Sequence, residues 1–270
     1  MKPRISCELS TFVRRHLPII VLFAAAPLAH ASTTCQPGPP GSGSQLCTSQ
    51  VNFAKFAQQA YQSQMAPEWC WAASIAMIFS YYGHPVSQAR IVSEVYGAPV
   101  NMPAQAGVVM AQQLNKVWVD DNNKWFSAKI TGVYDANAGV YALTNEQIIS
   151  ELDHDHPLLF ANTQHAVVLT AIQYYQTPYG PNVVAAGVFD PWPGIGARVL
   201  TSAELVPANQ GGQLTFLATA RVTDASPPSG GGTNATSDTN GGAVDECLLF
   251  VIGLLYVFAR RSLRLQDAVM

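Results

Sequence analysis

A single cysteine at the start of an apolar helical stretch constrains this chain more than any other feature. Cys70 lies just after Pro67, and apolar residues then recur at helical spacing until Gly83, which predicts a half-buried helix over 70–82. The N-terminus of a helix favours a thiolate, because its unpaired N–H groups and its dipole stabilise negative charge. Cys70 is therefore a candidate nucleophile, although a lone cysteine between two tryptophans is more often a small buried apolar residue.

A catalytic thiol needs a base, and that base needs a group that orients it. His165 is the favoured base, because it opens the β-branched apolar stretch 166–172 and a buried strand would hold its ring rigidly. Asp190 ends another strand, is kept extended by Pro191, and can accept a hydrogen bond from the imidazole. The competing interpretations are a structural histidine and an ordinary Asp-Pro turn.

Taken together, these residues resemble the papain-like cysteine peptidases. The resemblance is closest to a bacterial branch that includes a plant-pathogen effector protease and bacteriocin-leader-processing peptidases. It covers about residues 53–222 and rests on Gln64, Trp69-Cys70-Trp71-Ala72-Ala73, Gln164-His165-Ala166-Val167-Val168 and Phe189-Asp190-Pro191-Trp192.

The resemblance implies a role for each of four residues. Cys70 attacks the substrate carbonyl, and His165 is first general base and then general acid. Asp190, where papain itself has Asn, orients His165, and Gln64 helps to form the oxyanion hole. We also assign substrate-binding roles to neighbours of the catalytic residues, namely Trp69, Trp71 and Gln164.

The pattern of apolar residues predicts an α+β fold. Helices are expected over 70–82, 87–96, 106–116 and 144–152, the last with a capping box between Thr144 and Gln147. An antiparallel sheet is expected from strands over 125–130, 158–162, 166–173, 183–189 and 213–222, with a turn over 179–182. Together with these elements, the resemblance implies a papain-like two-lobed fold, in which the helical lobe carries Cys70 and packs on the β-sheet lobe that carries His165.

The N-terminal residues predict export. Residues 1–31 are basic, then apolar, and end in Ala29-His30-Ala31, which is typical of a signal peptide cleaved after Ala31. Residues 32–52 form a Cys/Pro/Gly-rich segment, in which Cys35 and Cys47 can form a disulfide in an oxidising compartment. Residues 53–225 are the expected peptidase domain.

The C-terminal residues predict a tether and an anchor or sorting signal. Residues 226–242 are a polar linker, and 243–270 contain Cys247, an apolar run and a basic end. The run over 247–259 is short for a spanning helix, which needs about 20 residues. Its layout resembles bacterial sorting signals processed near a cysteine, and a plain tail anchor is the alternative. The basic end predicts that the domain faces the periplasm or cell surface.

These features predict an exported cysteine endopeptidase that works through an acyl-enzyme. Transfer of the acyl group to an amine and a catalytically inactive peptide-binding module are the alternatives. The expected partners are a peptide or protein substrate, the membrane through the C-terminal segment, and an enzyme that processes that segment. Residues 32–225 are acidic overall without a basic cluster, so nucleic acid is not expected. No cofactor is expected, and the polar turn over 153–156 is interpreted as solvated surface and not as a metal site.

Overall fold

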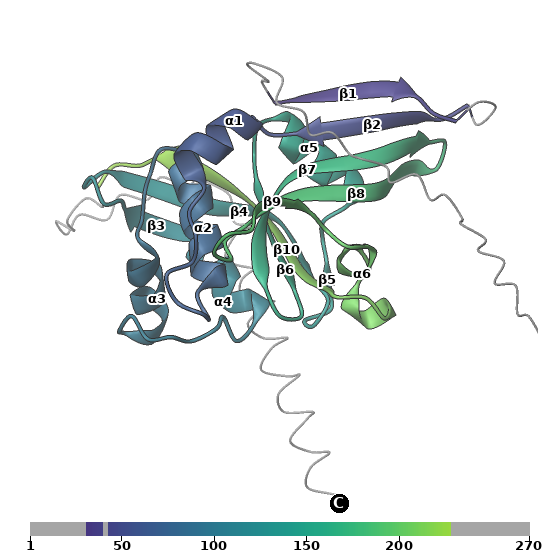
Figure 1. The fold of residues 1–270 in the computed structure, drawn as a ribbon. Coiled ribbons are helices and arrows are strands. Elements are labelled where there is room, and N and C mark those ends of the chain that lie inside the picture. The colour runs from purple at the N-terminus through teal and green to yellow at the C-terminus, as the bar shows by residue number, and fades with distance from the viewer. Residues whose placement is uncertain (1–30, 40–42, 228–270) are drawn as a thin grey trace, which may run out of the picture.

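The protein is built around one large antiparallel sheet (Figure 1). The computed structural model describes residues 31–39 and 43–227. Ten strands form the sheet, in the order β1-β2-β7-β6-β10-β4-β3, with β5 on β4, β8 on β7 and β9 on β8. Their bounds are β1 Ser32–Pro37, β2 Gln45–Gln50, β3 Lys116–Val119, β4 Trp125–Asp135, β5 Val140–Tyr141, β6 Leu158–Asn162, β7 Ala166–Thr177, β8 Gly180–Asp190, β9 Gly196–Val199 and β10 Leu214–Asp224.

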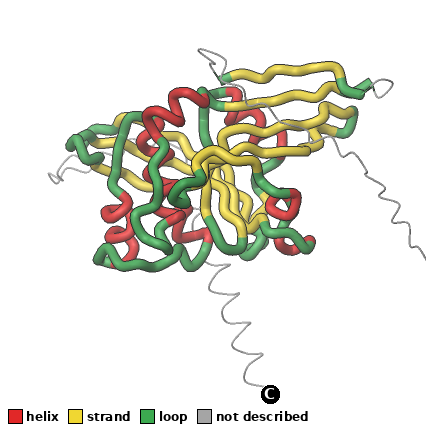
Figure 2. The backbone as a smooth tube through the Cα atoms, viewed as in Figure 1, coloured by secondary structure: helices red, strands yellow, loops and turns green. Residues whose placement is uncertain are grey.

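Helix α2 is buried on all sides and not half-buried as predicted, because all of its residues except Cys70 and Ser80 are buried. It packs against β6 and β7. Helices α3 and α4 contact α2 and lie away from the β1–β2 hairpin (Figures 1 and 2). Gly83 and Gly97 follow α2 and α3 with positive φ angles of 86° and 76°, which glycine adopts without steric cost. The helical segments are α1 Phe53–Lys55, η1 Phe56–Ala60, α2 Cys70–Tyr81, α3 Gln88–Tyr96, α4 Gly107–Gln113, α5 Asn145–Asp153, α6 Ser202–Leu205 and η2 Ala208–Gln210.

The predicted α+β class and the antiparallel sheet are confirmed. The four expected helices correspond to α2, α3, α4 and α5, and Thr144 and Gln147 form the expected capping box at the start of α5. The five expected strands fall on β4, β6, β7, β8 and β10, and all but β6 are longer than expected. The turn predicted over 179–182 is shorter, because Pro181 and Asn182 already pair with β7. The division into two lobes stays a prediction.

The segment 32–52 contributes strands that the sequence analysis did not predict. β1 and β2 form a hairpin, and β2 pairs with β7. Cys35 and Cys47 lie directly opposite each other in this hairpin and are joined by a disulfide. The N-terminal segment is thereby attached to the same sheet as the predicted domain.

Three of the predicted segments fall largely or wholly outside the described residues. These are the signal peptide, the linker and the C-terminal segment with Cys247. In the part of the chain that is described, no helix is long and apolar enough to cross a membrane.

Candidate active site

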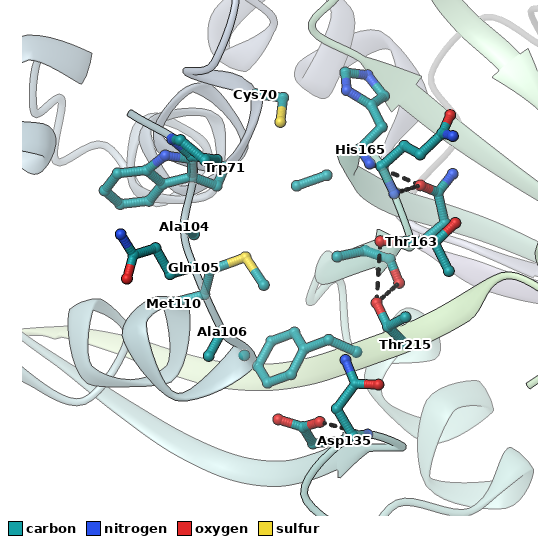
Figure 3. A pocket seen from close by; sticks show the side chains of 18 residues that line it. Cys70, Trp71, Ala104, Gln105, Ala106, Met110, Asp135, Thr163, His165 and Thr215 are labelled. Carbon is teal, nitrogen blue, oxygen red and sulfur yellow. Dashed lines mark hydrogen bonds between the residues drawn. The ribbon is translucent and has the colours of Figure 1, made fainter. Parts of the chain in front are cut away.

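The thiol of Cys70 lies at the end of a cavity of about 290 Å³ (Figure 3). Cys70 is the first residue of α2 and a free, partly buried cysteine. His165 immediately precedes β7 and lines the same cavity, at the same end as Cys70 in Figure 3. α2 packs against β7, and residues at the beginning of both elements line this cavity.

His165 is held by Asp190, as the sequence predicts. The imidazole Nε2 lies 2.6 Å from Oδ1 of Asp190, which is the last residue of β8 and is only 4% exposed. This contact leaves Nδ1 as the ring nitrogen that can exchange a proton with Cys70. Burial lowers the pKa of His165, but hydrogen bonds and charge from Asp190 and Cys70 outweigh burial and raise the pKa from 6.5 to about 9.

Asp190 is stabilised as a carboxylate by several donors. Burial raises its pKa, but His165, the backbone N–H of Trp192 at 2.8 Å and Arg198 together bring the pKa below its usual value. The Arg198 Nε donates to Asp190 Oδ2 at 2.7 Å. The charged imidazole therefore faces a carboxylate that stays ionised at neutral pH.

Arg198 and Glu204 extend this chain of contacts, and the sequence analysis missed both. Arg198 lies on β9, which pairs with β8, and donates two further hydrogen bonds to Glu204 at 2.9 and 3.0 Å. Glu204 lies in α6, where it also completes a capping box with Thr201. Burial raises the pKa of Glu204, but Arg198 and Thr201 lower it to about 2, so the pair is fully charged at neutral pH.

Asn162 closes the chain of contacts into a ring. Its Nδ2 donates to Glu204 at 3.1 Å, and its Oδ1 accepts the backbone N–H groups of Gln164 and His165 at 2.8 and 2.7 Å. Hydrogen bonds thus connect the side chain of His165, through three charged residues and Asn162, back to the backbone N–H of His165. In the sequence, the only sign of this ring is the position of Asn162. It stands two residues before Gln164 and three before His165, at the spacing at which an Asn side chain accepts backbone N–H groups.

Gln64 lies outside the cavity in this structure. Its Nε2 donates to the backbone carbonyls of Ala66 at 3.0 Å and Pro67 at 2.8 Å, and its backbone N–H donates to Pro191 at 2.7 Å. Both hydrogens of the Gln64 side-chain amide therefore have acceptors. These hydrogen bonds direct the amide toward the segment before Cys70. An oxyanion role would require the amide to turn, and this role stays a prediction.

The three predicted substrate-binding residues have different surroundings. Trp71 and Gln164 line the cavity, whereas Trp69 does not. The indole N–H groups of Trp69 and Trp71 donate to the carbonyls of Val100 and Met102 at 2.9 and 3.1 Å. Both buried indoles thus hold the segment between α3 and α4 against the start of α2.

Residues of the polar turn over 153–156 contact other parts of the protein. Asp155 accepts hydrogen bonds from the backbone N–H of Asn52 and from the hydroxyl of Tyr81. His156 lies between Glu151 at 3.0 Å and Arg221 at 2.7 Å. These residues are partly buried, so the expectation of a solvated surface holds for His154 and not for them. Within 31–39 and 43–227, no cluster of His, Cys, Asp and Glu has the arrangement of a metal site.

The comparisons agree with this geometry. A family model described as "Peptidase_C39 like family" matches residues 56–200, which is more than half of the chain and includes Cys70, His165 and Asp190. A comparison with curated proteins gave no match. The class of protein is that of the cysteine peptidases of the papain-like superfamily. Within this class, the chain belongs to the peptidase C39-like family.

Proposed function

We propose that this protein is an exported endopeptidase that cleaves peptide bonds with Cys70, His165 and Asp190. The observation that carries the proposal is the partly buried Cys70 facing an imidazole that Asp190 orients, in one cavity. A nucleophile, a base and a residue that orients the base are the parts that covalent catalysis by a thiol requires.

The reaction proceeds in two halves. The Cys70 thiolate attacks the peptide carbonyl carbon, and the imidazolium of His165 gives its proton to the departing amine, which leaves a thioester. The neutral imidazole then takes a proton from water, the hydroxide attacks the thioester carbon, and Cys70 departs as a thiolate with the protonated His165 beside it. A raised pKa of His165 supports this starting state, because the imidazole is protonated at neutral pH. The general-base step, in which His165 takes the proton of the Cys70 thiol, therefore precedes the attack on the substrate.

Export is part of the proposal and has two supporting observations. β1 begins at Ser32, the residue that would follow signal-peptide cleavage after Ala31. The disulfide between Cys35 and Cys47 suits an oxidising compartment such as the periplasm or the cell surface. Intact-mass analysis of protein from the native host tests both ends of the chain. A mature protein that starts at Met1 contradicts cleavage, and one that ends at Met270 in the inner membrane favours a tail anchor over a sorting signal processed near Cys247.

Replacement of the nucleophile tests the proposed chemistry. We expect Cys70→Ala to lower peptide cleavage by about 10³-fold or more and to abolish labelling by a thiol-reactive peptide probe. Folding should persist, because the side chain is small and lies at a helix end, and circular dichroism provides that control. Peptide cleavage by Cys70→Ala at the wild-type rate would overturn the proposal. Peptide products joined to an added amine would instead identify a transferase.

A further inference from the structure

The cavity extends well beyond the catalytic residues and contains a second ionisable group. Figure 3 shows Cys70 and His165 at one end and Asp135 at the other, with Met110 and Thr215 along the walls. Asp135 is the last residue of β4 and is only 6% exposed. A carboxylate is thus built into the cavity that a substrate must enter to reach the thiol.

Asp135 differs from the other buried acidic residues in its partners. Asp120 lies 3.1 Å from His84, and Asp190 and Glu204 share Arg198. No Lys, Arg or His of the described residues forms an ion pair with Asp135. A buried carboxylate without a cation is costly, and such groups in proteins are normally paired.

One oxygen of Asp135 is occupied and the other is not. Oδ1 accepts the backbone N–H groups of Asn137 at 3.0 Å and Ala138 at 3.1 Å. Oδ2 accepts no hydrogen bond from residues 31–39 or 43–227. On one side Oδ2 lies against Gly107 and Phe216, because a Cβ atom placed on Gly107 would lie 2.3 Å from Oδ2 and 2.4 Å from the ring of Phe216. Burial raises the pKa of Asp135 despite its two backbone donors, so a bound cation would relieve an existing cost.

We propose that Asp135 determines specificity by binding the ammonium or guanidinium group of a lysine or arginine at one fixed position of the substrate. The proposal rests on the proposed peptidase function and adds the class of residue that the cavity selects. Lys and Arg can lay their methylene chains along apolar surface while the charged end reaches a partner. Met110 and Phe216, which line the cavity, provide that surface. A second cavity of about 190 Å³ shares Asp135, Gly107 and Asn137 with the first, which leaves room around the carboxylate.

The variant Asp135→Asn isolates the charge. An asparagine keeps an Oδ1 that accepts the N–H groups of Asn137 and Ala138, so the local turn is retained while the negative charge is removed. Asp121→Asn is the matched control, because Asp121 pairs with Arg90 on the surface and does not line the cavity.

The experiment is the digestion of an N-acetylated peptide library by the wild type and both variants, with cleavage sites read by mass spectrometry. Acetylation removes the α-amino group as a competing cation. We expect wild-type and Asp121→Asn products to be enriched in Lys or Arg at one position relative to the scissile bond. For matched peptides, the ratio of kcat/KM for lysine over norleucine at that position should fall about 10- to 100-fold in Asp135→Asn.

A second measurement does not depend on turnover. It uses pairs of electrophilic peptides that alkylate Cys70 and differ only in having lysine or norleucine at one position. Because the electrophile is the same in both, the ratio of the two alkylation rates reports how the side chain at that position is recognised. Wild-type preference for the lysine probe that is lost in Asp135→Asn supports the proposal even where no hydrolysis occurs. Equal alkylation rates for lysine and norleucine probes, or a preference that persists in Asp135→Asn, overturn it. Failure of Cys70→Ala to stop cleavage is a separate result, which overturns the peptidase proposal.

Discussion

At the scale of single residues, the proposed chemistry depends on the protonation of His165 beside the ionised Asp190. His165 donates through Nε2 to the carboxylate of Asp190, which Arg198 also binds. The other ring nitrogen, Nδ1, is left to exchange a proton with Cys70. The sequence provided Cys70, His165 and Asp190, because each stands at the end of a recognisable helix or strand. It did not provide Arg198, since a cation on a short edge strand carries no local pattern that distinguishes it from a solvated residue.

The pKa of His165 leads to a prediction about pH. A histidine whose pKa rises to about 9 on folding contributes stability that is complete below 6.5 and is lost as the pH rises through 9. We expect the unfolding free energy of the wild type to exceed that of His165→Ala at pH 6, and the difference to become smaller at pH 10, because the contribution of the protonated imidazole is lost. Turnover at pH 7 should fall about 10³-fold in His165→Ala. Denaturant titrations at both pH values measure the first effect, with the exposed His154→Ala as control, and a difference independent of pH would argue against the raised pKa.

Arg198 is expected to act as a positioning residue. The double variant Arg198→Gln/Glu204→Gln removes both charges of this pair together, so neither is left unpaired in the interior. Because Arg198 helps to lower the pKa of Asp190, its loss should raise that pKa and move the acid limb of the kcat/KM profile to higher pH, with a fall in rate of about tenfold. The pH profile of the folded double variant checks this. An acid limb that stays in place would assign Arg198 a structural role only.

At the scale of elements, patterns of apolar residues predicted the elements with a continuous buried face and missed those without one. α2 and the centres of β6 and β7 are buried almost throughout. β1 is exposed along its whole length, and β9 alternates between partly buried and exposed residues, so neither has the apolar signal on which a strand prediction rests. β9 carries Arg198, and the missed element therefore explains the missed residue.

The β1–β2 hairpin is expected to depend on its disulfide. The bond closes a loop with a sequence separation of 12, and links of this length stabilise folded chains by about 3 kcal/mol through loss of entropy in the unfolded state. We expect Cys35→Ser/Cys47→Ser to accelerate amide hydrogen exchange in β1 and β2, because β2 is the only one of the described strands that pairs with β1. Cys70 should be alkylated at the wild-type rate, since the hairpin does not line its cavity. Unchanged exchange in the hairpin would show that strand pairing alone maintains it.

At the scale of the whole molecule, the proposed site joins two parts of the chain that are far apart in sequence. Cys70 comes from α2, whereas the residues that hold His165 come from a span between Asn162 and Glu204. The long-range pairing of β7 with β2, β6 and β8 places these parts next to each other. No local pattern encodes such a juxtaposition, which is why the cavity and the position of Asp135 in it emerged only from the structure.

The contacts around His165 also mean that its pKa changes during a catalytic cycle. With Cys70 as a thiolate, charges of alternating sign run from Cys70 through His165, Asp190 and Arg198 to Glu204. Acylation converts the thiolate into a neutral thioester, and one of the causes that raise the pKa of His165 disappears. The imidazole then binds its proton less tightly in the acyl-enzyme than in the resting enzyme, so the step that needs an acid and the step that needs a base each find His165 in the required form.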